Sequence, residues 1–237
     1  MKKPFAFIAL LASAIAFAQS AGPVIPQQGK TTEDFVPKGW KIISSASGDL
    51  NKDKAEDIAM VIENTDSANF VTNENFGSQI LNLNPRYLLI LFKDKKGYIL
   101  NTLNKSFIPS QNDIESPCLE DPLAEAEEMS ITKGVLSINF HTWMSCGSYG
   151  ISRETFRLRY QDNRFVLIGY DLWESSRNIG DITEVSINFL TGKKSTTTGE
   201  KLFDDNDNSL IQTTWEDIET NELINLANLK WPNEIEF

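Results

Sequence analysis

A strict alternation of apolar and polar residues recurs along the chain and predicts half-buried β-strands. In VLSINFHTW, residues 135–143, the side chains of Leu136, Ile138 and Phe140 fall on one face, and polar side chains fall on the other. Successive side chains of a strand point to opposite faces, so a period of two fits a sheet with one buried face. The alternation therefore favours antiparallel sheet over helix.

The same alternation predicts hairpins elsewhere. TFRLRY, residues 155–160, is followed by a polar turn and then by RFVLIGY, residues 164–170, as two paired strands would be. EVSINFLTGKK, residues 184–194, alternates again. YLLILF, residues 87–92, is instead a continuous apolar run before the turn residues KDKKG, which indicates a buried strand and a hairpin.

Only the C-terminal end has helical spacing. Leu223, Leu226 and Ala227 recur with a helical period before Pro232, which would end a helix. No internal repeat of 20 to 50 residues is present, which counts against a propeller or a solenoid. We therefore predict a mainly β fold, with an antiparallel sheet or a sandwich-like single domain over residues 33–237 and a minor helix near the C-terminus.

Residues 1–18 have the pattern of a signal peptide. Two lysines precede a short apolar run, and the small residues Ala16 and Ala18 frame a cleavage site after Ala18. The run is too short to span a bilayer, so we expect no membrane anchor. Residues 19–32 are rich in Gln, Gly and Pro and predict a flexible leader. The expected location is periplasmic or secreted.

Charge narrows the class of partner. Removal of the two N-terminal lysines leaves 20 basic residues against 33 acidic ones, a net charge of about −13. Such a charge argues against nucleic acid or anionic lipid as the main partner. It suits a soluble protein, a cation binder, or a surface that blocks a basic protein.

Two cysteines, Cys118 and Cys146, predict one disulfide bond, because an exported protein meets an oxidising compartment. Closing a loop of about 29 residues would stabilise the fold by about 3–4 kcal/mol in the chain-entropy model. The spacing does not fit a reactive CxxC pair.

One short loop carries oxygen donors in the phase that calcium requires. GDLNKDKAED, residues 48–57, offers side-chain oxygens at positions 1, 3, 5 and 9 and a backbone carbonyl at position 7. These donors are Asp49, Asn51, Asp53, Asp57 and the carbonyl of Ala55. Position 12 is Met60 instead of the glutamate of an EF-hand, and a strand-like sequence follows the loop. The loop is therefore not an EF-hand.

GDLNKDKAEDIAMVI, residues 48–62, resembles the single-copy calcium loop between two strands of FG-GAP or VCBS-type repeats. The stretches RLRYQDNRFVLIGYD and SINFLTGKK are similar to uncharacterised exported bacterial proteins that carry one such loop. The resemblance implies a structural calcium ion and no activity. Lys54 stands where glycine is usual, which predicts a positive φ costing about 1 kcal/mol. The alternative is a turn whose carboxylates face water or bond their own backbone.

The candidates for catalysis are few. The only histidine, His141, lies on the polar face of its predicted strand, without a nucleophile elbow or an H-E-x-x-H motif around it. A single histidine does not fit zinc sites built from two or three of them. No carboxylate pair is singled out among the acidic residues.

Three arginines, Arg153, Arg157 and Arg159, alternate onto one strand face in an otherwise acidic protein. They could capture a carboxylate or a phosphate. Alternatively, they pair with acidic side chains on a neighbouring strand.

Three functions follow from these features. The first is an exported, non-enzymatic protein with one structural calcium site and an unspecified role. The alternative is a periplasmic inhibitor or immunity-type protein that binds a basic enzyme. A carboxylate-dependent hydrolase is a weaker alternative.

Overall fold

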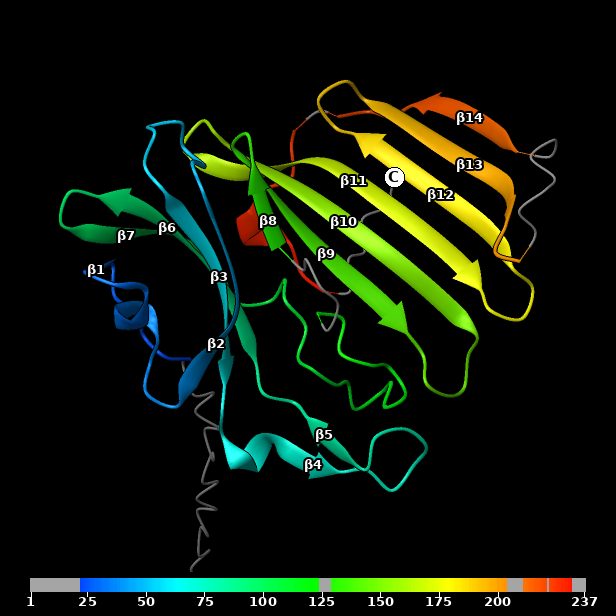
Figure 1. The fold of residues 1–237 in the computed structure, drawn as a ribbon, viewed down its shortest axis with the longest axis horizontal. Helices are drawn as coiled ribbons and strands as arrows, with labels where there is room; N and C mark the ends of the chain where they lie inside the picture. The colour runs from blue at the N-terminus through cyan, green and yellow to red at the C-terminus, as the bar shows by residue number, and fades with distance from the viewer. Residues whose placement is uncertain (1–21, 124–128, 204–210, 221, 232–237) are drawn as a thin grey trace, which may run out of the picture.

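The computed structural model describes residues 22–123, 129–203, 211–220 and 222–231, and these residues form antiparallel β-sheets (Figure 1). The predicted mainly β class is confirmed. The predicted signal peptide lies outside the described residues. All described helices are short 3₁₀ turns, and none has the length and apolarity needed to cross a bilayer.

The first sheet has five strands in the order β1-β7-β6-β3-β2. Its strands are β1 (Gln28–Gly29), β2 (Trp40–Gly48), β3 (Asp57–Asn64), β6 (Arg86–Asp94) and β7 (Gly97–Asn104). The continuous apolar runs of β3 and β6 are explained by this sheet, because it is covered on both faces. The predicted hairpin after YLLILF is the β6–β7 hairpin.

The second sheet has seven strands in the order β14-β13-β12-β11-β10-β9-β8. Its strands are β8 (Met129–Thr132), β9 (Val135–Trp143), β10 (Gly150–Gln161), β11 (Arg164–Ser176), β12 (Asp181–Asn188), β13 (Lys193–Lys201) and β14 (Gln212–Asp217). The predicted hairpin of TFRLRY with RFVLIGY is the β10–β11 pair. Its turn residues, Asp162 and Asn163, both have positive φ, as a tight hairpin turn requires.

A small hairpin of β4 (Phe70–Thr72) and β5 (Ile80–Asn82) projects away from both sheets, at the lower end of Figure 1. It follows the 3₁₀ turn η2 (Ser67–Asn69). The segment after β7 runs beside this hairpin before the chain enters the second sheet.

One apolar core lies between the two sheets. The inward side chains of β9 and β10, which the alternation predicted, meet residues of β3 and β6 there. Phe107, from the segment after β7, packs edge-on against Phe140 and Phe156 with ring centroids 5.4 and 5.2 Å apart. β12 contributes Ile187 to this core, and β13 and β14 extend past the first sheet (Figure 1).

The leader predicted for residues 19–32 is wrong for its described part. Ile25 is buried on the outer face of the first sheet, and Gln28 and Gly29 pair with β7. The 3₁₀ turn η1 (Thr32–Phe35) then buries Phe35 completely. This face of the sheet is apolar, so burying it stabilises a segment that has few apolar residues of its own. The packed part of the chain therefore begins before residue 33.

The minor helix predicted near the C-terminus is only a 3₁₀ turn, η4 (Leu226–Asn228). The Asn225 side chain accepts the Ala227 N–H, and the Leu167 N–H donates to the carbonyl of Ile224. This last bond and an isolated bridge between Asn225 and Val166 attach the segment to β11. Tertiary pairing therefore outcompetes the helical spacing.

Candidate functional site

The clasp loop, residues 48–57, closes the corner where the two sheets meet. A Cβ on Gly48 would lie 2.5 Å from Cγ2 of Ile131 in β8, so only glycine fits this approach. Leu50 is buried in the core between the sheets. The loop also lies against the β8–β9 turn, where a Cβ on Gly134 would be 3.5 Å from the Asp49 carbonyl.

Side-chain oxygens around the clasp loop accept its own backbone N–H groups. Asp49 accepts the N–H groups of Asp53 and Lys54, at 3.1 and 3.0 Å. Asn51 Oδ1 accepts the Asp53 N–H at 2.9 Å, and Asp53 accepts the Ala55 N–H at 2.7 Å. Lys54 has φ of 72°, so the positive φ predicted for it is confirmed.

Asp57, the first residue of β3, is fully buried. Its Oδ2 accepts the N–H groups of Leu50 and Asn51 at 2.9 and 3.3 Å, and its Oδ1 accepts the Lys93 N–H at 2.9 Å. Burial raises the pKa of this carboxyl, and the three N–H donors oppose that rise. Asp57 therefore ties the start of the clasp loop to β3 and to the end of β6.

The donor set of the clasp loop is thus divided. Within the described residues, no three His, Cys, Asp or Glu side chains are grouped so that they could hold a metal ion. Asp57 is buried, whereas Asp49, Asn51 and Asp53 lie on the exposed turn, and all four side chains accept backbone N–H groups. These three side chains and the carbonyl of Ala55 are hard oxygen donors of the kind that calcium takes. Calcium binding, with Asp57 as a ligand, remains a prediction.

The resemblance of the clasp loop to FG-GAP and VCBS-type repeats rests on one short segment. No family model, curated protein or solved structure matches this chain. The resemblance therefore remains a likeness of a loop, and it assigns no activity to the chain.

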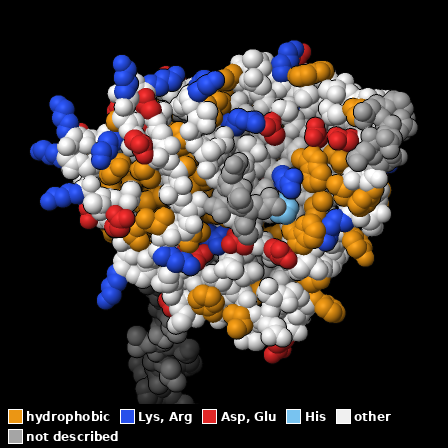
Figure 2. Space-filling view, in the orientation of Figure 1, with side chains coloured by type: hydrophobic (Ala, Val, Ile, Leu, Met, Phe, Trp, Pro, Cys, Tyr) orange, Lys and Arg blue, Asp and Glu red, His pale blue; other side chains and the backbone are white. Residues whose placement is uncertain are grey.

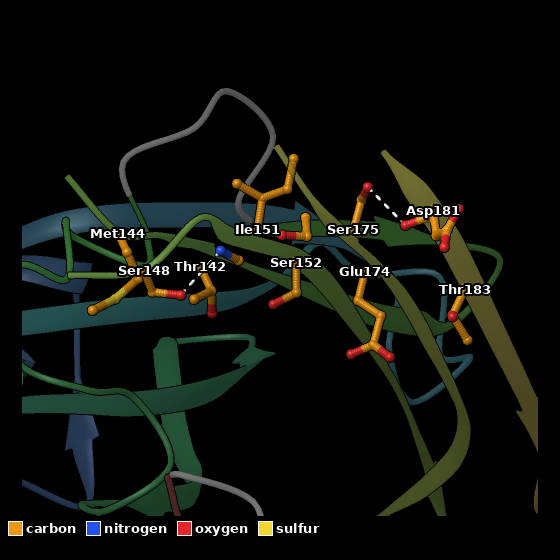
Figure 3. Close-up of a pocket in the computed structure, with 11 residues that line it drawn as sticks. Thr142, Met144, Ser148, Ile151, Ser152, Glu174, Ser175, Asp181 and Thr183 are labelled. Carbon is orange, nitrogen blue, oxygen red and sulfur yellow. Dashed lines mark hydrogen bonds between the residues drawn. The ribbon is translucent and has the colours of Figure 1, made fainter. Parts of the chain in front are cut away.

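A groove of about 440 Å³ lies at the ends of β9 to β12 (Figure 3). Thr142, Ser152, Glu174 and Thr183 stand opposite one another in register across these strands, and Figure 3 shows their side chains pointing the same way. The exposed Glu174 carboxylate lies among hydroxyl groups, and it can accept hydrogen bonds from an ammonium or guanidinium group or from another hydroxyl.

The His141 side chain does not face this groove. It neighbours Thr142 on β9, so its side chain points to the opposite face of the sheet. A histidine on the far face cannot take a proton from Ser152. The groove therefore lacks the serine–histidine geometry of a hydrolase.

A half-buried Glu154–Tyr170 pair is a feature that the sequence interpretation missed. The Tyr170 hydroxyl donates to Glu154 at 2.6 Å. Burial raises the pKa of Glu154, and burial together with the Glu154 carboxylate raises the pKa of Tyr170. The sequence contained a signal for this pair, because the alternation that turns Phe156 inward also turns Glu154 inward. Glu154 and Glu174 share one face of the sheet, and of the two only Glu174 lines the groove.

A buried ion-pair cluster was also missed. The Arg86 guanidinium donates to Glu63 on the neighbouring strand at 2.7 Å and to both carboxylate oxygens of Asp121 at 2.6 and 2.7 Å. Lys41 also pairs with Glu63, at 3.0 Å. The cluster attaches the segment before the second sheet to the first sheet. Its residues are far apart in sequence, so no local pattern predicts it.

The three arginines of β10 already have partners. Arg157 forms an ion pair with Asp171 on β11, which confirms for this residue the predicted pairing with an acidic neighbour. Arg159 donates to a glutamine two residues along the strand. Arg153 lies over the Trp173 ring, 5.5 Å from its centroid. The structure does not bring three uncommitted guanidinium groups together.

The predicted disulfide bond joins Cys118 to Cys146, with the Cα atoms 5.2 Å apart. It links the segment before the second sheet to the β9–β10 loop. The Arg177 guanidinium braces the same loop, because it donates to the carbonyls of Met144 and Ser148 at 2.6 and 3.1 Å.

Proposed function

We propose that the protein is an exported, non-enzymatic module whose clasp loop binds one structural calcium ion. The supporting observation is the position of this loop, which seals the corner between the sheets and buries Leu50 in their common core. An ion held by Asp49, Asn51, Asp53, Asp57 and the Ala55 carbonyl would restrain the turn there. The disulfide bond fits an oxidising compartment.

Calcium should raise the melting temperature of the chain that starts at Gln19. At a free calcium concentration ten times the dissociation constant, binding stabilises the folded state by about 1.4 kcal/mol. For a chain of this size, that increment raises the melting temperature by about 3–6 °C. The measurement is a thermal melt in chelator and in millimolar calcium.

The double variant Asp49→Ala with Asp53→Ala should lose this response. A matched control is Glu56→Ala with Glu74→Ala, which removes the same charge from exposed positions without touching the donor set. An unchanged melting curve of the wild-type protein at millimolar calcium would contradict the proposal.

A second function, a periplasmic inhibitor or immunity-type protein that binds a basic enzyme, is favoured by one feature of the surface. Residues 66–85 and 106–122 contain no Lys or Arg, although the chain has 22 such residues. The charged side chains of these two segments are therefore all acidic, and the small projecting β4–β5 hairpin belongs to them. A surface of one sign attracts partners of the opposite sign.

A further inference from the structure

The projecting hairpin and the segment beside it form one unit, the acidic lobe, made of residues 66–82 and 111–118. The Asn82 N–H donates to Asn112 Oδ1 at 2.9 Å, and the Asn82 side chain donates to Gln111 at 2.9 Å. Near the hairpin tip, the Ser78 N–H donates to the carbonyl of Pro117 at 3.4 Å. The two segments therefore present a common surface.

This lobe exposes large apolar side chains. Phe76 at the hairpin tip is 85% exposed, and Phe70, Ile80 and Ile114 are also exposed. The lower end of Figure 2, where the lobe projects, shows hydrophobic side chains with acidic ones and no Lys or Arg. Clustered exposed apolar side chains on a soluble domain mark an interaction surface more often than scattered ones do.

The loop that carries Phe76 is held in one shape. The Asn73 side-chain amide donates to the carbonyls of Asn75, Phe76 and Ser78 at 3.4, 3.0 and 3.0 Å. Its Oδ1 accepts the Asn75 N–H at 2.9 Å. Gly77 has φ of +99°, and its Cα lies so close to Pro117 that a Cβ would be 2.2 Å from the Pro117 carbonyl oxygen. An aromatic side chain on a pre-organised loop loses little entropy on binding.

The charges of the lobe indicate the chemical class of its partner. Its ionisable side chains are all acidic: Asp66, Glu74, Asp113 and Glu115. Carboxylates on the same lobe as an apolar anchor repel anionic membranes and a second copy of that lobe. They attract a basic protein, and Phe76 can fill an apolar pocket on it.

We propose that the acidic lobe is the docking surface for a basic protein, with Phe76 inserted into an apolar pocket and Glu74 and Glu115 facing its Lys and Arg side chains. This inference rests on the second function proposed above. It adds the surface, the anchor residue and the chemistry of the partner.

The test uses the chain from Gln19 as immobilised bait against envelope extract of the producing cells. Bound proteins are identified by mass spectrometry, and the basic protein retained is purified for titration calorimetry. Phe76→Ser should weaken its binding at least about tenfold. Glu74→Lys with Glu115→Lys should weaken binding and reduce its salt dependence. The control is Trp215→Ser, because Trp215 is 70% exposed on β14 and outside the lobe.

The outcomes distinguish failure of the proposed docking surface from failure of the proposed inhibitor function. If a basic protein binds the wild type and Phe76→Ser equally, the docking surface is wrong and the inhibitor function survives. If no basic protein is retained, both are wrong. Phe76-dependent binding to vesicles of phosphatidylethanolamine and phosphatidylglycerol, or a Phe76-dependent dimer in light scattering, overturns the docking surface. An unchanged melting temperature of Phe76→Ser shows that its folding is intact.

Discussion

Asp57 is the residue on which the clasp loop depends most directly. Both of its carboxylate oxygens are occupied by backbone N–H groups, and replacement by alanine leaves one buried and two partly buried donors without this acceptor. We expect Asp57→Ala to lower the free energy of unfolding by about 2–4 kcal/mol. The measurement is urea unfolding in chelator, so that calcium cannot contribute. Asp57→Asn keeps one acceptor oxygen and should lower the free energy of unfolding by less.

If Asp57→Ala is as stable as the wild type in chelator, the structural role of Asp57 is contradicted. A loss that appears only in calcium would instead make Asp57 a metal ligand, as the loop pattern predicted. The two roles are therefore separable with one variant.

Glu154 makes the stability of the folded state depend on pH. Burial raises its pKa in the folded state, so the folded protein binds its proton more tightly than the unfolded chain does. The free energy of unfolding should therefore fall as pH rises from the ordinary carboxyl pKa through the raised one. Glu154→Gln keeps an acceptor for Tyr170 and removes this titration.

The measurement is urea unfolding of wild type and Glu154→Gln between pH 4 and pH 8. As pH rises, the free energy of unfolding of the variant should increase relative to that of the wild type. This difference should stop growing above the raised pKa of Glu154. A difference that does not change with pH would contradict the burial of an ionisable carboxyl at this position. Glu184→Gln, on the solvent-facing side of β12, is the control.

At the scale of elements, η1 and β1 cover a sheet face that would otherwise meet water. Phe35 is fully buried in the outer core of the first sheet. Phe35→Ala should lower the free energy of unfolding by about 3–5 kcal/mol, because surrounding side chains relax only partly into the cavity that it leaves. Val24→Ala, in the same segment and 91% exposed, should change little. If the two variants are equally stable, the result contradicts the packing of this segment and supports the flexible leader predicted from the sequence.

At the scale of the whole molecule, the two sheets share one core and should unfold together. Phe107 contacts aromatic rings of β9 and β10 and comes from the segment that follows the first sheet. We expect Phe107→Ala to destabilise the protein by about 3–5 kcal/mol and to preserve a single transition. Far-UV circular dichroism and tryptophan fluorescence should report the same midpoint. Two separate midpoints would mean two independent folding units.

The sequence by itself determined several of the strands and part of the local turn chemistry. The alternating segment 135–143 is β9 with the same bounds, and its inward residues are buried. Lys54 has the positive φ that its place in the loop predicted. These features follow from interactions within a few residues, so a local pattern contains the information needed to find them.

Only the tertiary structure decided which surfaces meet. Residues 22–32 look like a leader until the apolar outer face of the first sheet offers them a place to pack. The loop pattern around Asp57 does not show that the Lys93 N–H, 36 residues away, reaches its carboxylate. The acidic lobe exists only because the segment 111–118 returns to the β4–β5 hairpin. Contacts between distant segments depend on the complementarity of whole surfaces, and periodicity along the chain does not encode that complementarity.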